Sequence, residues 1–328
     1  MNDLAIETRA LRKTYGRTVA LDALDLQVAR GEVFGFLGPN GAGKTTAVKL
    51  LLGLARPTGG EGSVLGRPLG DLDARRRLGY LPELFRFQAW LTAREVLGLH
   101  CELAGIPRPR RASEIDRVLD VVGLATRGRD RVGGFSKGMQ QRLGIGAALL
   151  GDPELVLLDE PTSALDPVGR DDVRGIIRHA QERGSAVLLN SHLLGEVERL
   201  CNRVAIVNRG RVVAAGALTD VAGDPELRIR VTDLPDAEAR LGAFGPVTLD
   251  DEGWFVIRPL PVAAVPDVVA AVVAAGGRVH AVDPAGRSLE EAFLALVRGN
   301  PAPDADTADP PATRPPGMPP GASQGARW

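Results

Sequence analysis

One short segment limits the possible folds of this 328-residue chain more than any other. It fits the pattern G-x-x-x-x-G-K-[ST] and consists of Gly38, Pro39, Asn40, Gly41, Ala42, Gly43, Lys44 and Thr45. The apolar run 33–37 before it is typical of a strand buried on both faces, and residues 45–54 read as a helix. A glycine-rich loop between a buried strand and a helix predicts a phosphate-binding loop, because its N–H groups and the helix N-terminus can face an anion.

The loop also predicts roles for individual side chains. The Lys44 ammonium can neutralise the β and γ phosphates of a nucleotide, and the Thr45 hydroxyl can bind Mg²⁺. Thr46 can donate a further hydrogen bond to phosphate. The alternative is a glycine-rich turn with a surface lysine. The strand before the loop and the helix after it favour the phosphate site.

A second apolar run, 155–158, ends in two carboxylates, Asp159 and Glu160. An aspartate at the end of a buried strand can reach Mg²⁺ through water. The neighbouring glutamate can polarise the attacking water as a general base. Adjacent acidic residues are often only the solvated end of a strand. A strand as apolar as this one rarely ends in two carboxylates without a cation, which favours a catalytic role.

His192 follows a third apolar run, 186–189. Near a phosphate site a histidine can hold the γ phosphate and orient the attacking water. A lone histidine is more often structural, and we interpret His100, His179 and His280 in that way, or as exposed. For His192 the setting predicts a catalytic role.

A turn with the pattern Ser-x-Gly lies between the phosphate loop and the acidic strand. Its residues are Phe135, Ser136, Lys137, Gly138, Met139 and Gln140. Ser136 and Gly138 at the start of a helix offer a hydroxyl, an amide and the helix dipole to a terminal phosphate. Ser136 would cap that helix in any case, and the phosphate contact is the additional prediction.

Up to about residue 222, apolar strands alternate with helices, which predicts an α/β domain with a largely parallel sheet. Residues 85–150 are helical in pattern, and we interpret them as a helical subdomain inserted into this domain. Capping-box patterns at Thr92 and at Ser113 indicate helix starts within the insertion.

The rest of the chain divides into two parts. Residues 225–298 have a βαββαβ-like order, ending in a helix that Ser288 would cap, and predict a small α+β accessory domain of regulatory role. Residues 299–328 contain eight prolines and little that is apolar. Such a segment buries too little apolar surface to offset the conformational entropy that it would lose on ordering, so we expect a disordered tail.

Composition excludes several classes of protein. The chain has 40 basic and 41 acidic side chains, so it has no general attraction to nucleic acid or to acidic membranes. Cys101 and Cys201 make no metal or disulfide spacing, which predicts inert buried thiols in a reducing compartment. The longest apolar run, 262–275, is too short to span a bilayer. We expect a cytoplasmic chain that reaches a membrane only through a partner.

The order of loop, Ser-x-Gly signature, acidic strand and histidine resembles the ATP-binding subunit of an ATP-binding cassette (ABC) transporter. The resemblance covers about two thirds of the chain. It implies the fold of a P-loop NTPase cassette and the binding and hydrolysis of ATP with Mg²⁺. It also implies that Tyr15 stacks on adenine, and that a loop crosses the dimer interface, formed by Ser163, Ala164, Leu165 and Asp166.

The same resemblance implies partners. Two such subunits, most simply a homodimer, pack head to tail, and each completes the other's ATP site with its signature. The dimer drives a separate integral-membrane permease and sits on the inner face of the cell membrane through that contact.

Two positions depart from the usual family pattern. Lys137 and Met139 stand in a signature that usually reads Leu-Ser-Gly-Gly-Gln, and Glu83 stands where the family has Gln. A carboxylate can still ligate Mg²⁺ or hold a water, so Thr45, Glu83 and Asp159 are the expected metal set. Both departures resemble the drug-export branch, which implies export of a drug, antibiotic, lipid or similar cargo.

Two other functions stay open as alternatives. ABC ATPases also work on ribosomes or DNA, usually with two cassettes or a long coiled coil, whereas this chain shows one cassette and no heptads. A slow regulatory ATP sensor is conceivable because of Glu83. The segment 84–90 holds three of the thirteen aromatic residues, and it could form either a groove for a permease helix or the core of the helical subdomain.

Overall fold

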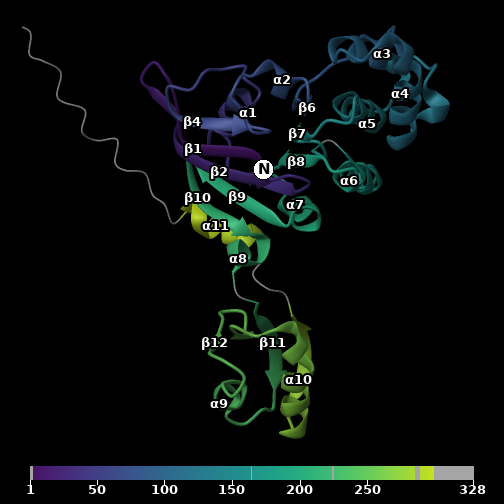
Figure 1. Cartoon of the computed structure of the whole chain (residues 1–328). Coiled ribbons are helices and arrows are strands. Elements are labelled where there is room, and N and C mark those ends of the chain that lie inside the picture. The colour runs from purple at the N-terminus through teal and green to yellow at the C-terminus, as the bar shows by residue number, and fades with distance from the viewer. Residues whose placement is uncertain (1–2, 164, 224, 285–288, 299–328) are drawn as a thin grey trace, which may run out of the picture.

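The central sheet brings the ends of the phosphate-loop strand and the acidic strand to one edge. The computed structural model describes residues 3–163, 165–223, 225–284 and 289–298. The sheet has the order β10-β9-β3-β8-β7-β6, with all neighbours parallel except β10 and β9 (Figure 1). Its strands are β3 Val33–Leu37, β6 Leu78–Leu81, β7 Leu155–Asp159, β8 Ala186–Asn190, β9 Arg203–Asn208 and β10 Arg211–Ala217. The carboxyl ends of parallel strands meet at the same edge, which is where α/β proteins bind their ligands.

A second sheet is antiparallel and covers one side of the first. Its order is β2-β1-β4-β5, and its strands are β1 Leu4–Tyr15, β2 Thr18–Ala29, β4 Gly59–Val64 and β5 Arg67–Pro68. Helix α1, Lys44–Leu51, buries Ala47, Val48, Leu50 and Leu51 in the core that these two sheets share. The helix that carries the phosphate loop is therefore fixed from two sides.

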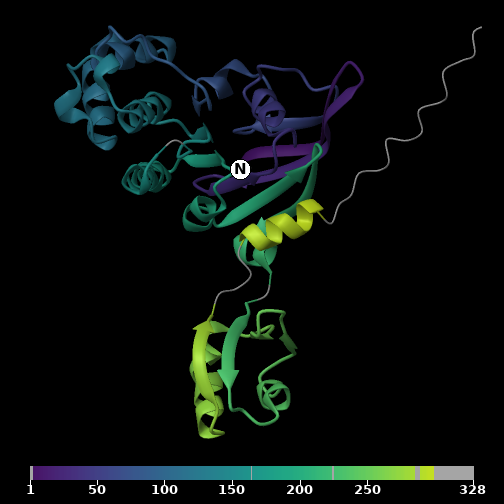
Figure 2. The ribbon, with the colours of Figure 1, turned by 180° about the vertical axis from the view of Figure 1, so that it is seen from behind.

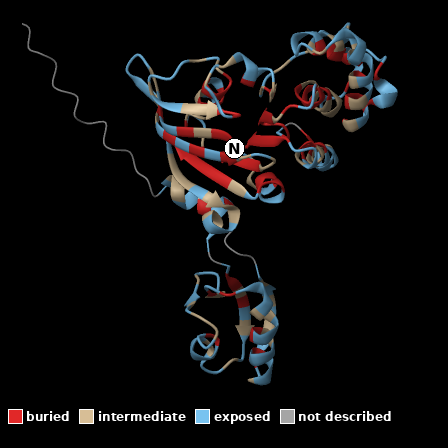
Figure 3. Cartoon of the chain, in the orientation of Figure 1, coloured by how far each residue is buried: buried red, intermediate tan, exposed pale blue. Residues whose placement is uncertain are grey.

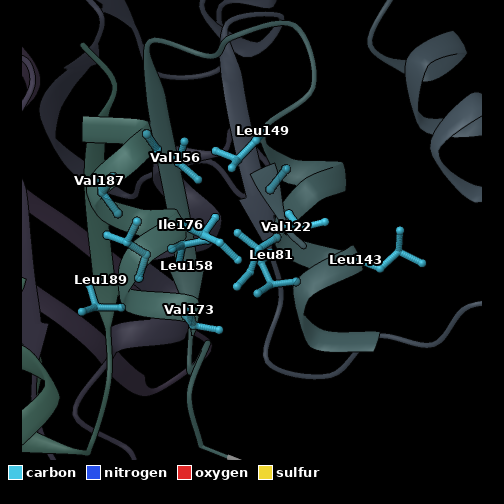
Figure 4. Close-up of a cluster of buried hydrophobic side chains, with 14 of the residues drawn as sticks. Leu81, Val122, Leu143, Leu149, Val156, Leu158, Val173, Ile176, Val187 and Leu189 are labelled. Atoms are coloured by element: carbon cyan, nitrogen blue, oxygen red, sulfur yellow. The ribbon is translucent and has the colours of Figure 1, made fainter. Parts of the chain in front are cut away.

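Alternation along the buried strands divides the core into two clusters. Leu155 and Leu157 of β7 face the cluster shared with α1, whereas Val156 and Leu158 face the opposite side. This follows from the two-residue period of a strand. Burial is concentrated in the central sheet (Figure 3), and Figure 4 shows Val156 and Leu158 of the second cluster with side chains of the helices α5 and α6. These helices are α5 Lys137–Ala148 and α6 Pro167–Glu182.

The helical subdomain projects from one end of the sheet (Figure 1). Besides α5 it contains α3 Ala93–Leu103, α4 Arg108–Val121 and the 3-10 turns η1 Ala125–Arg127 and η2 Val132–Gly134; the short helix α2, Leu72–Arg75, precedes it. The predicted capping box at Thr92 is confirmed, since its hydroxyl accepts from the Glu95 amide and the Glu95 carboxylate accepts from the Thr92 amide. The helix start predicted at Ser113 is wrong. Helix α4 begins earlier, after Pro107, because Pro109 fits its first turn, and Ser113 Oγ donates to Arg110 O inside the helix.

The sequence left open whether the aromatic segment 84–90 forms a groove for a permease helix or the core of the helical subdomain. Its side chains fall into two groups. Phe85 and Phe87 are partly buried against the core, with ring centroids 5.3 Å apart. Leu84 and Trp90 are instead 87% and 70% exposed. The phenylalanines therefore belong to the core of the helical subdomain, and Leu84 and Trp90 form part of its surface.

The C-terminal region contains a small sheet with its own core. The strand order is β12-β13-β11-β14, all antiparallel, which is the order of a ferredoxin-like βαββαβ unit. Leu227, Ile229, Ile257, Val268 and Val272 are buried within it. Its elements are β11 Leu227–Thr232, α9 Ala237–Leu241, β12 Val247–Leu249, β13 Phe255–Ile257, η3 Val262–Ala264, α10 Val265–Ala274 and β14 Arg278–Asp283.

The final helix, α11 Leu289–Arg298, does not pack in this small domain. It lies against α7, Leu194–Leu200, and α8, Leu218–Ala222, of the ATP-binding part (Figure 2). The sequence pattern placed it in the accessory domain because the two are consecutive in the chain. The predicted cap at Ser288, residue Ala164 and the tail 299–328 lie outside the described residues. Within the described ranges, no helix has the length and apolar character to cross a membrane.

Candidate nucleotide site

A cavity of ≈ 830 Å³ opens at the carboxyl edge of the central sheet. The phosphate loop, the ends of β6, β7 and β8, and a stretch of β2 line it. Of the predicted residues, the cavity collects the whole loop, its two threonines, the acidic pair, Glu83 and the histidine: Gly38, Pro39, Asn40, Gly41, Ala42, Gly43, Lys44, Thr45, Thr46, Glu83, Asp159, Glu160 and His192. Residues from four separate parts of the sequence therefore converge on one hollow, as a nucleotide site requires.

The loop needs its glycines for two physical reasons. Gly41 and Gly43 have φ values of 80° and 103°, in the left-handed region that a residue with a Cβ adopts only with strain. A Cβ on Gly43 would also lie 2.4 Å from Ala20 O, and one on Gly38 would lie 2.3 Å from Val207 O. The loop is thus packed directly against the backbone of β2 and β9.

The Lys44 ammonium is directed over the loop. Its Nζ donates to Gly38 O at 2.6 Å and to Pro39 O at 3.2 Å. Burial lowers the pKa of Lys44, while the carboxylates of Glu160, Asp159 and Glu83 act in the opposite direction. The ammonium therefore lies where it can pair with the phosphates that the loop would cradle.

The acidic pair and the histidine meet at the ends of β7 and β8. His192 Nδ1 lies 2.7 Å from Glu160 Oε2. That oxygen is buried and forms no hydrogen bond of regular geometry among the described residues. Burial raises the pKa of Glu160, and the contact with His192 opposes the rise. A carboxylate with a raised pKa suits a general base.

The Glu160 backbone is unusual. Its φ of 52° lies in the left-handed region, and its amide donates to Asn190 O at 2.8 Å. Non-glycine residues in this region cost free energy and cluster at functional sites. The neighbouring strand thus holds the chain in the turn that directs Glu160 into the cavity.

The residues around Asp159 fit a bound Mg²⁺. Asn190 Nδ2 donates to Asp159 Oδ1, and the Asn190 Oδ1 atom is buried without a partner among the described residues. Thr45, Glu83 and Asp159 all line the cavity, and oxygen atoms of this kind are the ligands that Mg²⁺ prefers. No cluster of three or more His, Cys, Asp or Glu side chains in the described ranges could hold a metal by itself. A Mg²⁺ here would therefore share its coordination with phosphate oxygens and water.

Tyr15 lies beside the cavity rather than among its lining residues. It is 49% exposed, and Lys13 Nζ is 4.9 Å from its ring centroid. Its hairpin partner Thr18 lines the cavity together with Val19 and Ala20. Stacking of Tyr15 on adenine stays a prediction.

The signature lies outside the cavity of its own chain. Ser136 caps α5, and its Oγ accepts from the Met139 amide at 3.2 Å. Ser136 and Lys137 are exposed, Phe135 is buried, and Gly138, Met139 and Gln140 are half-buried. Capping is thus confirmed, and contact with a partner's phosphate stays a prediction.

The loop expected at a dimer interface lies next to the signature. A Cβ added to Gly138 would lie 3.6 Å from Leu165 Cδ2, and Leu165 is buried. Ser163 Oγ donates to Glu160 O at 3.2 Å, and Asp166 caps α6 by accepting from Gly169 N. This loop therefore connects the turn at Glu160 to the signature within one chain.

Several lining residues of the cavity were not predicted from the sequence, and two of them, Asn190 and Phe293, contribute most to its character. Asn190 follows the apolar run 186–189, and a polar residue at the end of a buried strand was the available signal. Phe293 also lines the cavity, although it comes from α11. Nothing in the local sequence around Phe293 indicates this contact, because it depends on where α11 packs.

The fold and the site define a P-loop nucleotide-binding cassette. A family model described as "ABC transporter" matches residues 21–163. An uncharacterised ABC transporter ATP-binding protein of Synechocystis sp. is 39% identical over 302 residues, which covers 89% of this chain and 84% of the relative. The bacitracin transport ATP-binding protein BcrA of Bacillus licheniformis is 43% identical over 211 residues, covering 63% of this chain and 68% of the relative.

The solved structures agree. One described as the ATP-binding subunit of an ABC transporter has a TM-score of 0.61 and 32% identity, and covers 66% of this chain and 91% of its own. The chain belongs to the ABC transporter family, as an ATP-binding subunit. The resemblance seen in the sequence is therefore confirmed, and proteins of this family are in general ATPases.

Proposed function

We propose that this subunit hydrolyses MgATP at the interface of a head-to-tail dimer and drives export through a separate membrane permease. One observation carries the proposal. The cavity gathers the phosphate loop, Asp159, Glu160 and His192, while the signature at Ser136 lies outside it. The cavity thus has a candidate base and a phosphate-binding loop. The start of α5, which can also bind phosphate, lies outside it and would serve the nucleotide of a partner subunit.

Each side chain has a defined task in hydrolysis. Lys44 and the loop amides bind the phosphates, and the Glu160 carboxylate accepts a proton from the attacking water. His192 holds that carboxylate and the γ phosphate in place. Mg²⁺, held by Thr45 and Asp159 with Glu83 nearby, would neutralise the charge on the phosphate oxygens.

The dimer follows from the position of α5. Its N-terminus presents the Ser136 hydroxyl and backbone N–H groups at the surface, and such helix starts bind phosphate. A second copy packed head to tail would bring this helix start against the nucleotide in the first copy's cavity. Ser163, Leu165 and Asp166 would then lie at the same interface.

The permease and the direction of transport have separate support. Leu84 and Trp90 are exposed, as is Leu103, which lines a cavity of ≈ 350 Å³ with Leu72 and His100. Exposed apolar side chains of this kind suit contact with a helix of a membrane partner. The similarity to a bacitracin transport protein favours export of an antibiotic-like cargo. The subunit would then sit on the cytoplasmic face of the membrane.

The dimer is tested by trapping it with ATP. Glu160→Gln should bind MgATP without turnover and elute as a dimer, and adding Ser136→Arg should return it to a monomer. Ser113→Arg, at an exposed position on α4, is the matched control and should leave the dimer intact. Light scattering after size exclusion measures the mass. A Ser136→Arg protein that still dimerises on ATP would refute the role of the signature.

The partner is tested by co-purification from the native host. Recovery of a membrane protein that depends on detergent supports the transporter function. Loss of that protein after Leu84→Glu with Trp90→Glu would assign the docking surface. Recovery of ribosomes or DNA in a salt-sensitive manner would instead support the non-transport alternative.

A further inference from the structure

Helix α11 is anchored at both ends to elements of the nucleotide site. At its start, the Leu289 amide donates to Glu198 Oε1 of α7 at 2.6 Å. Near its end, Asn208 Nδ2 of β9 donates to Val297 O at 3.3 Å. Leu289 and Ala292 are buried, at 0% and 4% exposure. The helix is thus a fixed part of the ATP-binding domain, although the chain reaches it only after residues 225–284 (Figures 1 and 2).

Phe293 is the contribution of this helix to the cavity. It lines the same hollow as His192 and Leu194. Phe293 and Leu194 both pack against the core cluster that contains Val156 and Leu158. Among the described residues beyond β10, no other side chain lines this cavity.

The histidine needs such support. The His192 side chain is 59% exposed, and its polar contact within the described part of the chain is with the Glu160 carboxylate. The segment that follows is held locally, with the Leu193 amide donating to Ser191 Oγ at 3.1 Å. An exposed imidazole can adopt several rotamers. The side chains packed beside His192 therefore decide what fraction of the time its ring faces the Glu160 carboxylate.

We propose that Phe293 is a positioning residue for ATP hydrolysis. Its ring supports the segment 191–194 so that the His192 imidazole stays against the Glu160 carboxylate. The anchoring of α11 to Glu198 and Asn208 keeps the ring in place. This inference rests on the proposed hydrolytic roles of Glu160 and His192.

The test is steady-state ATPase kinetics of the full chain. Phe293→Ala should lower kcat by between about 10-fold and about 10²-fold, the range expected when a catalytic group shifts by up to an ångström, and leave KM for ATP nearly unchanged. Phe293→Leu keeps apolar volume and should recover most of the rate. Leu294→Ala is the matched control, because Leu294 is the neighbouring residue, is 39% exposed and does not line the cavity.

A double-mutant cycle separates positioning from a general loss of structure. In a His192→Ala background, Phe293→Ala should have little further effect on kcat, because the group that it positions is gone. Glu198→Gln should cause a smaller fall in kcat with the same dependence on His192. Thermal unfolding of each variant shows whether the chain is still folded, and Phe293→Leu serves if Phe293→Ala does not fold.

Three outcomes would overturn the inference. They are equal effects of Phe293→Ala and Leu294→Ala, a rise in KM alone, which would mean direct contact with the nucleotide, and full additivity with His192→Ala. A Glu160→Gln protein that keeps normal turnover would instead refute the proposed function itself. The two failures are therefore distinguishable.

Discussion

The Glu160 carboxylate and the His192 imidazole are in contact across the ends of two neighbouring strands, with Oε2 and Nδ1 2.7 Å apart. The residues are far apart in sequence, and only the parallel pairing of β7 with β8 brings them together. Asp159 and Asn190 form a register pair in the same ladder. Pairing of the strands therefore sets the geometry of the contact between Glu160 and His192 before any nucleotide binds.

Substitution of these two residues should give different kinetic patterns. Glu160→Gln removes the base and should lower kcat by about 10²-fold or more, with ATP binding retained. His192→Ala should lower kcat less, because the base remains but is less well held. Steady-state rates together with binding of a fluorescent ATP analogue measure both quantities. Loss of nucleotide binding in Glu160→Gln would contradict the assignment.

A series of glycine-to-alanine variants should separate strain from collision in the phosphate loop. In Gly41→Ala the added Cβ has open space around it, but the positive φ at this position strains a residue with a Cβ. This variant should cost on the order of 1–3 kcal/mol of stability in the loop. Gly43→Ala adds a collision with Ala20 O and should abolish ATP binding. Gly134→Ala has neither problem and is the control. Equal ATP affinity of the Gly41 and Gly43 variants would show that the collision does not matter.

Breaking the buried ion pair between α6 and α7 should destabilise the fold. Arg174 Nη1 lies 2.9 Å from both Glu196 oxygens, and the two side chains are 11% and 7% exposed. Arg174→Met leaves a buried carboxylate without its partner and should cost about 3–5 kcal/mol. Asp171, 74% exposed, also pairs with Arg174, so Asp171→Asn should cost much less. Chemical denaturation measures the free energy of unfolding for each variant.

Part of the stability should depend on pH through Glu114. The Arg117 guanidinium lowers the pKa of this carboxyl, and the Gly151 amide adds to the effect against the cost of burial. A lowered folded-state pKa means that the contribution is present above the unfolded pKa, about 4.3, and is lost as pH falls through the folded value. Glu114→Gln should therefore lower Tm at pH 7, and the difference from wild type should shrink in acid. Glu182→Gln, at an exposed position on α6, is the control for loss of one surface carboxylate.

The thiols should be inert in the folded chain. Cys101 and Cys201 are free and buried, as the sequence predicted. Burial raises the pKa of both, that of Cys201 to about 12. Because the thiolate is the reactive form, neither should react with an aromatic disulfide reagent at pH 8 until the chain is unfolded. Rapid labelling of the native protein would contradict this.

The parts that could be predicted from sequence are those decided by local physical chemistry. The phosphate loop, the acidic pair and the Thr92 cap each depend on a few consecutive residues. Even there, a proline can override a pattern: the Ser113 signal resembled a helix start, but Pro107 and Pro109 began α4 earlier.

The parts that could not be predicted depend on contacts distant in sequence. Whether Phe85 or Leu84 faces the core is decided by how the segment lies on α5, where Gly144 leaves room for the Phe85 ring. The place of α11 depends on Glu198 and Asn208, each roughly ninety residues earlier in the chain. Periodicity carries no information about such pairings.

The packing of α11 beside α8 has an evolutionary consequence. The chain leaves the ATP-binding domain after α8 and returns to it at α11, and these two helices are in contact. A domain joined at two adjacent points can be exchanged for another without disturbing the host. Related transporters could thus share the same ATP-binding domain and differ in the domain that is inserted between Ala222 and Leu289.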